Sequence, residues 1–594
     1  MVQRFTPVLV IIAVGVLLTW PLALAPGDAL PQGQFTLTQA WTYDLLTRAL
    51  VDEGRVIGFT DQMLWPWGGY LAVVGWQYIL PLLIPALLGL SIIPGLNLLI
   101  FGQLLAAALA LYALSRRLGA GAWPAAMAGI FYGFHPFAFH QIHNGQLSEL
   151  CHWGLPLLAL LLLDGAAWKP GWRSVAIGLV LGLTLAASPY SALAGGLLCV
   201  VLGIWALVRS EPHRRRATTG ALAAVAGSML LGALPFLYYY LVMPADHYLI
   251  LRPNDVNNWH SGMNQDLPTF TSLAGWFVPY RFFEAHWRAV ESGIMAPNGA
   301  VAGSTSLDHA IGLVALALAV LGLRRRTDHP PTPRALPTPG RATWMWTGLL
   351  FGVAASGYAL ILYPHSHFEL PGSAIPLPAS LPLALFPKLG MIGAPYRLAP
   401  GVLLVVAVLA AQGLTRMTST LRGLPRAAVL AVALVAVSAE GAWSDVIPHP
   451  LPMQGLTAPQ VYRDLARSND DGGVLTIPWW PQVHMADTQI HLSWQRVHRH
   501  PIHVGEGGVI RPEDLTDFTA RVEAIGGVNS PLDASDPGRG EGVPARWIVV
   551  HEAALLQHQR VPIESILTEN ADLVRRYDDD NIQLWEVRPR AQAR

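Results

Sequence analysis

One stretch of twenty residues, FHPFAFHQIHNGQLSELCHW (134–153), gathers four histidines, a glutamate and a cysteine between two strongly apolar segments. His140 and His143 are three residues apart, and so are Glu149 and His152, so each pair can share one face of a helix. Imidazole and carboxylate groups are ligands for transition metals, and they equally suit the wall of a substrate cavity. A third interpretation is a plain boundary between membrane and water, where polar side chains serve a turn between two helices.

The spacing within this stretch favours a substrate cavity over a metal site. Asn144-Gly145 interrupts the run, and nothing in the sequence fixes a third metal ligand. We therefore expect His140, His143 and Glu149 to bind substrate. A divalent metal is the weaker alternative, and we expect no other cofactor.

The composition indicates a membrane protein. Of the 594 residues, 53% are hydrophobic and only 13% are charged, whereas soluble proteins carry about 25% charged residues. The net charge is zero, so no basic field indicates nucleic acid as a partner. The two cysteines form neither a disulfide framework nor a Cys-x-x-Cys zinc motif.

Apolar runs long enough to cross a bilayer predict about eleven transmembrane helices. They are 7–25, 95–115, 121–138, 152–168, 173–188, 190–209, 217–242, 307–323, 343–363, 396–415 and 427–447. The clusters of basic residues between them all fall on one side if the N-terminus is cytoplasmic, as positive-inside bias requires. The C-terminus is then periplasmic. We expect the first run to remain as an uncleaved helix.

Two interruptions complete this topology. The run Tyr78 to Ile92 is short for a crossing, and we interpret it as a re-entrant or interfacial helix. Pro189, in AASPYSA, divides a long apolar run into two helices near the outer face. Irregular backbone at that depth must be buried in protein, because lipid offers it no hydrogen bonds.

The chain divides into a membrane domain (1–448), with a long first external loop (26–94), and a periplasmic α/β domain (449–594). In the second domain, GGVLTIPWW and RWIVVHE indicate strands, and LVRRYDDDNIQLWEV indicates a hairpin. The predicted fold is mainly α: a polytopic membrane protein with a small external α/β domain at its C-terminus.

The first external loop carries the acidic candidates for catalysis. Apolar residues from Leu37 to Leu50 recur at helical spacing and predict an amphipathic helix along the membrane surface. Asp44, Arg48 and Asp52 lie on its other face at steps of four, where ion pairs are the ordinary interpretation. Asp28 sits in a Pro-Gly turn without a cation near it in sequence, so it can act as a general base or cap the following helix.

This order of elements resembles the GT-C superfamily of integral-membrane glycosyltransferases, and more closely its large bacterial members. One membrane helix precedes a long external loop with acidic residues and a surface helix, and many spans and an external α/β domain follow. The segments that carry the resemblance are FTLTQAWTYDLLTRAL, LWPWGGYL, LALYALSRRLGAGAWPAAMAGIFYGFHPFAFHQIHNGQLSELCHWGLPLLAL, IGAPYRLAPGVLLVVAVLAAQGL and VLTIPWWP.

The resemblance implies inverting transfer of a sugar from a polyprenyl-phosphate carrier to an acceptor, with a carboxylate of the first loop as the base. Members of the superfamily often have Gly-Asp just before the surface helix, where this chain has Gly33-Gln34. Because Gln34 cannot serve as a base, either Asp28 or Asp44 has taken the role, or transferase chemistry has been lost.

Basic residues near the outer surface are expected, by the same resemblance, to hold the carrier phosphate. Arg397, in APYRLAP at the outer start of a span, is the first candidate, because guanidinium binds phosphate through two parallel hydrogen bonds. Snorkelling to the interface explains it equally well. Arg252 and Lys388 are the further candidates.

We therefore expect a glycosyltransferase of the bacterial inner membrane that works at its periplasmic face. Its partners are a polyprenyl-phosphate-linked sugar, membrane lipid and an acceptor of unknown class: glycolipid, polysaccharide or protein. The alternative is a non-catalytic GT-C relative that scaffolds or transports lipid-linked intermediates. A general transporter is disfavoured, because the chain shows neither internal repeats nor charged groups deep within its spans.

Overall fold

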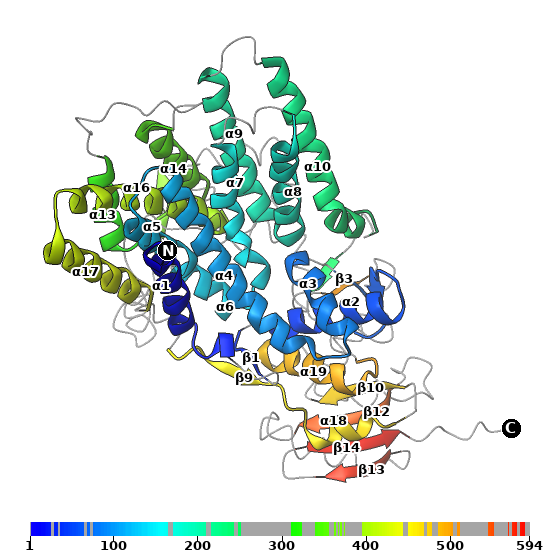
Figure 1. The fold of residues 1–594 in the computed structure, drawn as a ribbon. Helices are drawn as coiled ribbons and strands as arrows, with labels where there is room; N and C mark the ends of the chain where they lie inside the picture. The colour runs from blue at the N-terminus through cyan, green and yellow to red at the C-terminus, as the bar shows by residue number, and fades with distance from the viewer. Residues whose placement is uncertain are drawn as a thin grey trace.

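The structure is a computed structural model of the chain. It describes residues 2–24, 29–33, 36–63, 68–71, 75–163, 170–209, 215–242, 248–250, 311–323, 339–355, 361–363, 366–367, 369–370, 373–374, 395–442, 449–468, 472–477, 485–502, 508–510, 545–551, 568, 573–578 and 582–587. The described chain is mainly helical with a small sheet region, as predicted, and the sheet lies below the helices in Figure 1.

Each of the eleven predicted segments overlaps a helix of the bundle. These helices are α1 (Val2–Leu18), α4 (Ile92–Arg117), α5 (Ala122–Gly133), α7 (Gly154–Leu162), α8 (Trp172–Ala187), α9 (Pro189–Arg209), α10 (Arg215–Val242), α13 (Leu313–Leu323), α14 (Arg341–Ala355), α16 (Ala399–Ser419) and α17 (Gly423–Ala442). In the described part of the chain, three helices are long and apolar enough to cross a membrane: α4, α9 and α16. The number of crossings stays a prediction.

Helix α16 is the central element of the bundle. It runs 21 residues, roughly 31 Å at 1.5 Å per residue, which matches the hydrocarbon thickness of a bilayer. It packs closely against α13, because a Cβ at Gly413 would lie only 1.9 Å from the carbonyl oxygen of Leu318. Small residues allow such close approach of two backbones in membrane helices.

Two arginines that border predicted spans, Arg341 and Arg416, lie at one end of the bundle. Arg416 Nη1 donates to the carbonyl oxygens of Leu321 (3.1 Å) and Gly322 (2.7 Å), at the end of α13. Arg341, at the start of α14, donates to Leu323 O at 3.1 Å. These contacts place the arginines that begin α14 and end α16 at the same end of the bundle. The orientation of the chain in a membrane stays a prediction.

The first external loop forms short strands and two helices at the opposite end of the bundle. They are β1 (Ala29–Pro31), α2 (Thr36–Asp52), β2 (Phe59–Thr60), β3 (Gly69–Leu71) and α3 (Trp76–Leu87). The helix predicted along the membrane surface is present as α2, but its apolar face is covered by protein. Leu37, Trp41 and Leu46 are at most 2% exposed, because α2 packs against α3 and against helix α19 (Met485–His498).

The C-terminal region contains the predicted strands. Its four-stranded sheet has the order β10-β12-β14-β13, with β10 (Gly473–Ile477) parallel to β12 (Ala545–His551) and the other pairs antiparallel. The predicted hairpin is β13 (Leu573–Asp578) and β14 (Ile582–Val587). Helices α18 (Gln460–Leu465) and α19 pack together beside this sheet.

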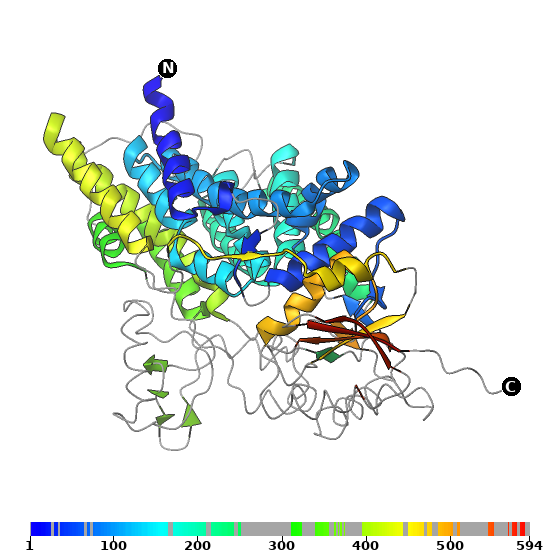
Figure 2. The same cartoon turned by 90° about the horizontal axis from the view of Figure 1, so that it is seen from below.

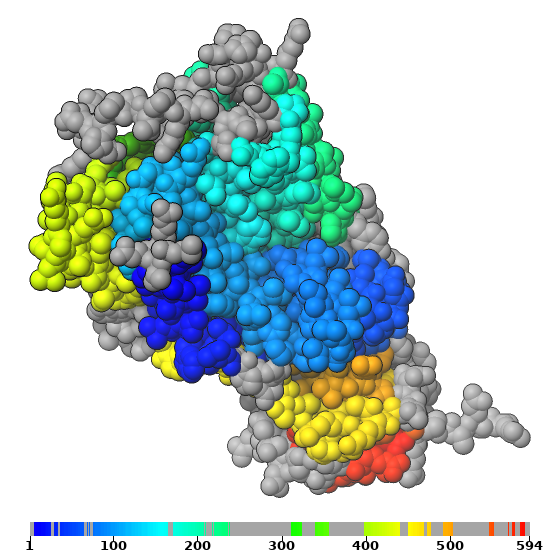
Figure 3. Space-filling model, in the orientation of Figure 1, coloured from blue at the N-terminus to red at the C-terminus, as the bar shows by residue number. Residues whose placement is uncertain are grey.

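Strands from distant parts of the chain join the first loop to the C-terminal region. Strand β1 pairs with β9 (Met453–Gly455), and β11 (Gly508–Ile510) pairs with both β3 and β4 (Tyr248–Ile250). Figures 1 and 3 show the C-terminal region directly against α2 and α3. The predicted domain boundary at residue 448 is thus crossed by two small sheets, and as a boundary it stays a prediction.

Two small hairpins complete the described elements. Strand β5 (Ile361–Tyr363) pairs with β6 (Ser366–His367), and β7 (Glu369–Leu370) pairs with β8 (Ser373–Ala374). Figure 2 shows them apart from the C-terminal sheet.

Candidate functional site

The histidine stretch folds as two short helices at the end of the bundle opposite Arg416. Helix α6 (Pro136–His143) is followed by a turn at Asn144-Gly145 and by the 3-10 helix η2 (Leu147–Trp153). His135 caps α6, because its Nδ1 accepts a hydrogen bond from the Phe137 N–H at 3.1 Å. We call residues 135–153 the tip.

A buried ion pair connects the tip to the start of α16. Arg397 Nη1 lies 3.3 Å from Glu149 Oε1, and the two side chains are 19% and 5% exposed. Ser188 Oγ donates to the other carboxylate oxygen, Glu149 Oε2, at 2.7 Å. The guanidinium also lies over the ring of Tyr190, 4.7 Å from its centroid. Two candidates that are 248 residues apart in sequence therefore meet in one site.

Local sequence explains why these side chains converge. Pro189 ends α8, and Ser188 adopts an extended backbone between α8 and α9, with its side chain facing Glu149. Ser188 is 1% exposed, so the irregular backbone at this break is buried in protein, as expected. Arg397 lies in the 3-10 helix η7 (Pro395–Leu398) that precedes α16.

The electrostatics of the pair depend on its partners. Removing a carboxylate from water disfavours its charged form, whereas a guanidinium and a hydroxyl donor favour that form. Guanidinium cannot be deprotonated in proteins, so Arg397 remains a fixed positive charge at this end of the bundle. An anion that reaches Arg397 therefore competes with Glu149 for the same donors.

The first external loop holds the tip in place. The backbone of Leu147 donates to Gln39 Oε1 on α2 (3.2 Å) and accepts from the Tyr78 hydroxyl on α3 (3.0 Å). Gly33 packs against the tip, where a Cβ would lie 2.4 Å from Ile142 O and 2.9 Å from His143 O. Only glycine fits here, so the residue before Gln34 lies directly on the histidine stretch.

The tip histidines point to separate partners. His140 Nε2 is hydrogen-bonded to Asn144 Nδ2 at 2.7 Å, the ring of His152 packs edge-on against Tyr132, and His143 is exposed. Among the residues that the structure describes, no group of three or more His, Cys, Asp or Glu side chains is placed to hold a metal ion.

Asp44 is not part of the Glu149–Arg397 site. It lies on α2, on the face that packs against α19. Its Oδ2 is 2.9 Å from Arg48 Nη2 and 3.4 Å from Arg496 Nε. Beside it, Trp41 Nε1 donates to Gln495 Oε1 at 2.7 Å. Asp28, Gln34, Arg252 and Lys388 lie outside the described residues.

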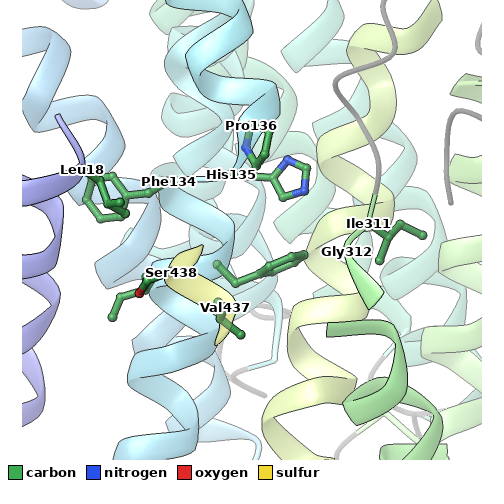
Figure 4. A pocket seen from close by; sticks show the side chains of 10 residues that line it. Leu18, Phe134, His135, Pro136, Ile311, Gly312, Val437 and Ser438 are labelled. Atoms are coloured by element: carbon green, nitrogen blue, oxygen red, sulfur yellow. The ribbon is translucent and has the colours of Figure 1, made fainter. Parts of the chain in front are cut away.

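A small pocket beside His135 is too small for a sugar. It is lined by Leu18, Phe134, His135, Ile311 and Ser438, among others, as Figure 4 shows. Its volume is about 30 Å³, whereas one water needs about 10–15 Å³ on this measure. The pocket has room for two or three waters at most.

A second histidine cluster, which the sequence did not reveal, forms the core of the C-terminal region. His491, His498, His500 and His551 are each at most 9% exposed. The hydroxyl of Tyr462 is 2.7 Å from His551 Nε2, and the Tyr462 ring stacks on His498. Burial, reinforced by the neighbouring His500, lowers the pKa of His498 to about 3. Burial also lowers the pKa of His491 well below its usual value.

Comparison with known proteins identifies the fold. No protein-family model and no curated protein matches the sequence. The structure is similar to the cryo-EM structure of the arabinofuranosyltransferase AftD from Mycobacteria, with a TM-score of 0.59 and 15% identity over 98% of this chain and 40% of that chain. A mutant of AftD gives a TM-score of 0.57 at 15% identity, over 99% of this chain and 42% of that chain. The chain thus spans about two fifths of the AftD length.

A weaker likeness is to ArnT from Cupriavidus metallidurans bound to undecaprenyl phosphate, with a TM-score of 0.38 and 15% identity over 98% of both chains. A TM-score below 0.5 does not establish a shared fold. The likeness to the arabinofuranosyltransferase AftD confirms the expected resemblance as a likeness of fold.

Four residues of the site were not predicted. Ser188 and Tyr190 flank the proline break, which was the one available signal, since a helix interrupted between two spans often exposes side chains to a cavity. Gln39 and Tyr78 lie within predicted helices, and no pattern distinguishes them from ordinary polar positions. Only their tertiary contacts reveal that they hold the tip.

Proposed function

We propose that the protein is an inverting GT-C-type glycosyltransferase that transfers a sugar from a polyprenyl-phosphate carrier to an acceptor at the periplasmic face of a bacterial inner membrane. The observation that carries this proposal is the Glu149–Arg397 pair, which lies at the start of α16, whereas Arg416 lies at its other end. The fold that it shares with the arabinofuranosyltransferase AftD supports the reaction class.

Arg397 is the proposed ligand of the carrier phosphate. It precedes a helix of bilayer length, so its guanidinium lies at the depth of lipid headgroups. The phosphodiester of the sugar-loaded carrier has one negative charge and gains a second as the sugar leaves, and guanidinium binds phosphate through two parallel bonds. When the carrier binds, Arg397 turns from Glu149 to the phosphate and stabilises the charge that develops on the leaving group.

Asp28 is the proposed general base, and Asp44 is the proposed structural link. A general base needs a free lone pair within reach of the acceptor hydroxyl. The Asp44 carboxylate is engaged by Arg48 and Arg496, and it faces α19 rather than the tip. Asp28 removes the acceptor proton, the acceptor oxygen attacks the anomeric carbon, and polyprenyl phosphate leaves from the opposite face.

The remaining candidates surround this reaction. His140, His143 and Glu149 bind the acceptor or the sugar, and Arg252 and Lys388 add positive charge near the carrier. A divalent metal at the tip is the weaker alternative, which elemental analysis of the purified protein tests.

Native mass spectrometry with undecaprenyl phosphate tests the proposal. We expect the full-length protein to retain the carrier, and Arg397→Ala to weaken binding at least about tenfold, since hydrogen bonds to charged groups contribute roughly 1.5–3 kcal/mol. Arg422→Ala is the matched control, because this arginine is exposed and follows α16 at the other end of the bundle. Equal binding by all three proteins contradicts the proposal.

One observation favours the second candidate function, a non-catalytic scaffold or transporter of lipid-linked intermediates. Gln34 occupies the position where GT-C members often have the catalytic aspartate, and Asp44 is held by two arginines. Asp28→Asn separates the two functions. It abolishes transfer if Asp28 is the base, whereas carrier binding without any transfer by the unmodified protein identifies the scaffold.

A further inference from the structure

A polar crevice lies at the C-terminal end of α2, away from the Glu149–Arg397 site. Its volume is about 500 Å³, within the range of ligand pockets of about 300–1,000 Å³. The end of α2, the segment that follows it and Arg499 at the end of α19 contribute its described lining. We call this cavity the α2 crevice.

The charges of the crevice do not favour a strongly charged ligand of either sign. Its described lining contains three guanidinium groups and three carboxylates, a formal sum of zero: Arg48, Arg55, Arg499, Asp52, Glu53 and Asp61. A phosphate attracted by the arginines is repelled by the carboxylates, and a cation experiences the reverse. The crevice therefore suits a neutral molecule with many polar groups.

The hydrogen-bonding capacity of the lining narrows the ligand class. Guanidinium only donates and carboxylate only accepts, so a ligand that satisfies both must carry groups that do both. Hydroxyl groups meet this requirement, and adjacent hydroxyls of a sugar can bind one planar carboxylate or guanidinium through two bonds. Phe59 adds an apolar surface to the same lining, suited to the C–H face of a sugar ring.

The backbone of Arg499 is a second, independent observation. Arg499 has a φ of 62°, in the left-handed region. Among the described residues, it is the one residue other than glycine with a positive φ. Its N–H bonds to Gln495 O at 2.8 Å and closes the end of α19, a position where glycine or asparagine is usual. The chain has arginine at this position, with its side chain lining the crevice.

We propose that the α2 crevice binds a neutral oligosaccharide. The inference rests on the proposed function and names its acceptor class, a neutral glycan. The crevice holds one part of this glycan while another part of the same glycan reaches the transfer site. On α2, Gln39 contacts the tip and Arg48 lines the crevice, nine residues or roughly 14 Å further along the helix, so one sugar unit does not occupy both.

Glycan titration of the full-length protein in lipid nanodiscs tests the proposal. The probes are short neutral oligosaccharides of glucan, mannan, galactan and arabinan, with a sulfated oligosaccharide for comparison. We expect at least one neutral probe to bind, and Asp52→Ala and Arg499→Gly each to raise its Kd at least about tenfold. Arg499→Gly removes the side chain while it suits the backbone, so a loss of binding in a well-folded variant cannot be ascribed to misfolding.

Arg467→Ala is the matched control, because this exposed arginine follows α18 and pairs with Asp464 outside the crevice. Tighter binding of the sulfated probe, no binding of neutral probes, or native affinity in both crevice variants overturns the proposal. Native mass spectrometry of the same samples measures carrier binding. Carrier bound without glycan overturns this inference alone. Glycan bound without carrier refutes the proposed function and the acceptor role, and leaves only glycan binding by the crevice.

Discussion

Two histidine-rich regions of this molecule differ in how sequence proximity relates to contact. The tip has four histidines within eighteen positions, 135–152, and three of them have different partners: His135 caps α6, His140 bonds to Asn144 and His152 packs on the ring of Tyr132. The C-terminal histidines are spread over sixty positions, 491–551, yet His491 and His551 have ring centroids 4.8 Å apart.

The two regions also differ in how they accommodate buried ionisable side chains. The tip contains Glu149, and its charge is balanced by Arg397 from a distant helix. The C-terminal cluster needs no counter-charge. Burial lowers the pKa of His491 and His498, so both imidazoles are uncharged at neutral pH. Breaking the ion pair should therefore have a larger effect than charging one imidazole.

The largest effect is expected for Arg397→Ala at the tip. Removing one partner of a buried pair leaves an uncompensated carboxylate, which typically costs about 3 kcal/mol. Glu149→Gln keeps the oxygen that accepts from Ser188, so the double variant should lose less than Arg397→Ala alone. Thermal unfolding of the three variants in one detergent checks this, and additive losses would refute coupling between the two residues.

The second-largest effect is expected from acid, which should lower the folding stability of the C-terminal cluster. The folded-state pKa of His498, about 3, lies below the unfolded value of about 6.5, so the unfolded chain binds more protons in acid. The stability present above pH 6.5 is therefore lost as the pH falls towards 3, by about 2 kcal/mol at pH 5 for this one group. Unfolding midpoints at pH 7 and pH 5 measure the loss.

His498→Asn provides the control for that scan. It retains a side-chain acceptor for the His500 N–H, which now bonds to His498 Nδ1 at 3.1 Å, and it cannot titrate in this range. We expect a smaller difference between the two midpoints. An unchanged difference would show that the acid response arises elsewhere.

A smaller effect is expected where the two regions are linked through α2. Gln495 accepts from Trp41 Nε1 and donates to Gln62 Oε1, both at 2.7 Å. Gln495→Leu leaves these buried groups without partners, which costs about 1–2 kcal/mol. Gln460→Leu, which removes a single bond to Asp464 at the protein surface, should change the unfolding midpoint far less.

The smallest expected effect is an increase in folding stability, for Arg499→Gly. Arg499→Gly places the residue that prefers a left-handed backbone at φ 62°, and should stabilise the end of α19 by about 1 kcal/mol. Arg499→Ala keeps the strain and serves as the comparison. Equal unfolding midpoints for the two variants would show that the conformation carries no strain.

Much of the fold was predictable because membrane helices and half-buried strands have strong local patterns. Every predicted segment from 7–25 to 427–447 contains a helix, and the run from Tyr78 to Ile92 folds as the short helix α3. The burial of α2 was not predictable. An apolar face that packs on α19 has the same periodicity as one that rests on lipid.

Of the candidate site, the sequence indicated the residues but not their pairing. Glu149 and Arg397 were separate candidates, and no spacing encodes a contact between positions 248 residues apart. The break at Pro189 was visible, but the role of Ser188 as a partner of Glu149 depends on how α8, α9 and η2 pack. Asp28, Arg252 and Lys388 stay predictions.

The pairing of β1 with β9 has a consequence for biosynthesis. Strand β1 leaves the ribosome soon after the first helix, but its partner emerges more than four hundred residues later. The same holds for α2, whose Trp41 meets Gln495. The face of the first loop that the C-terminal region covers thus remains open until synthesis is nearly finished. This half of the protein is therefore completed last, when its earliest and latest segments pair with one another.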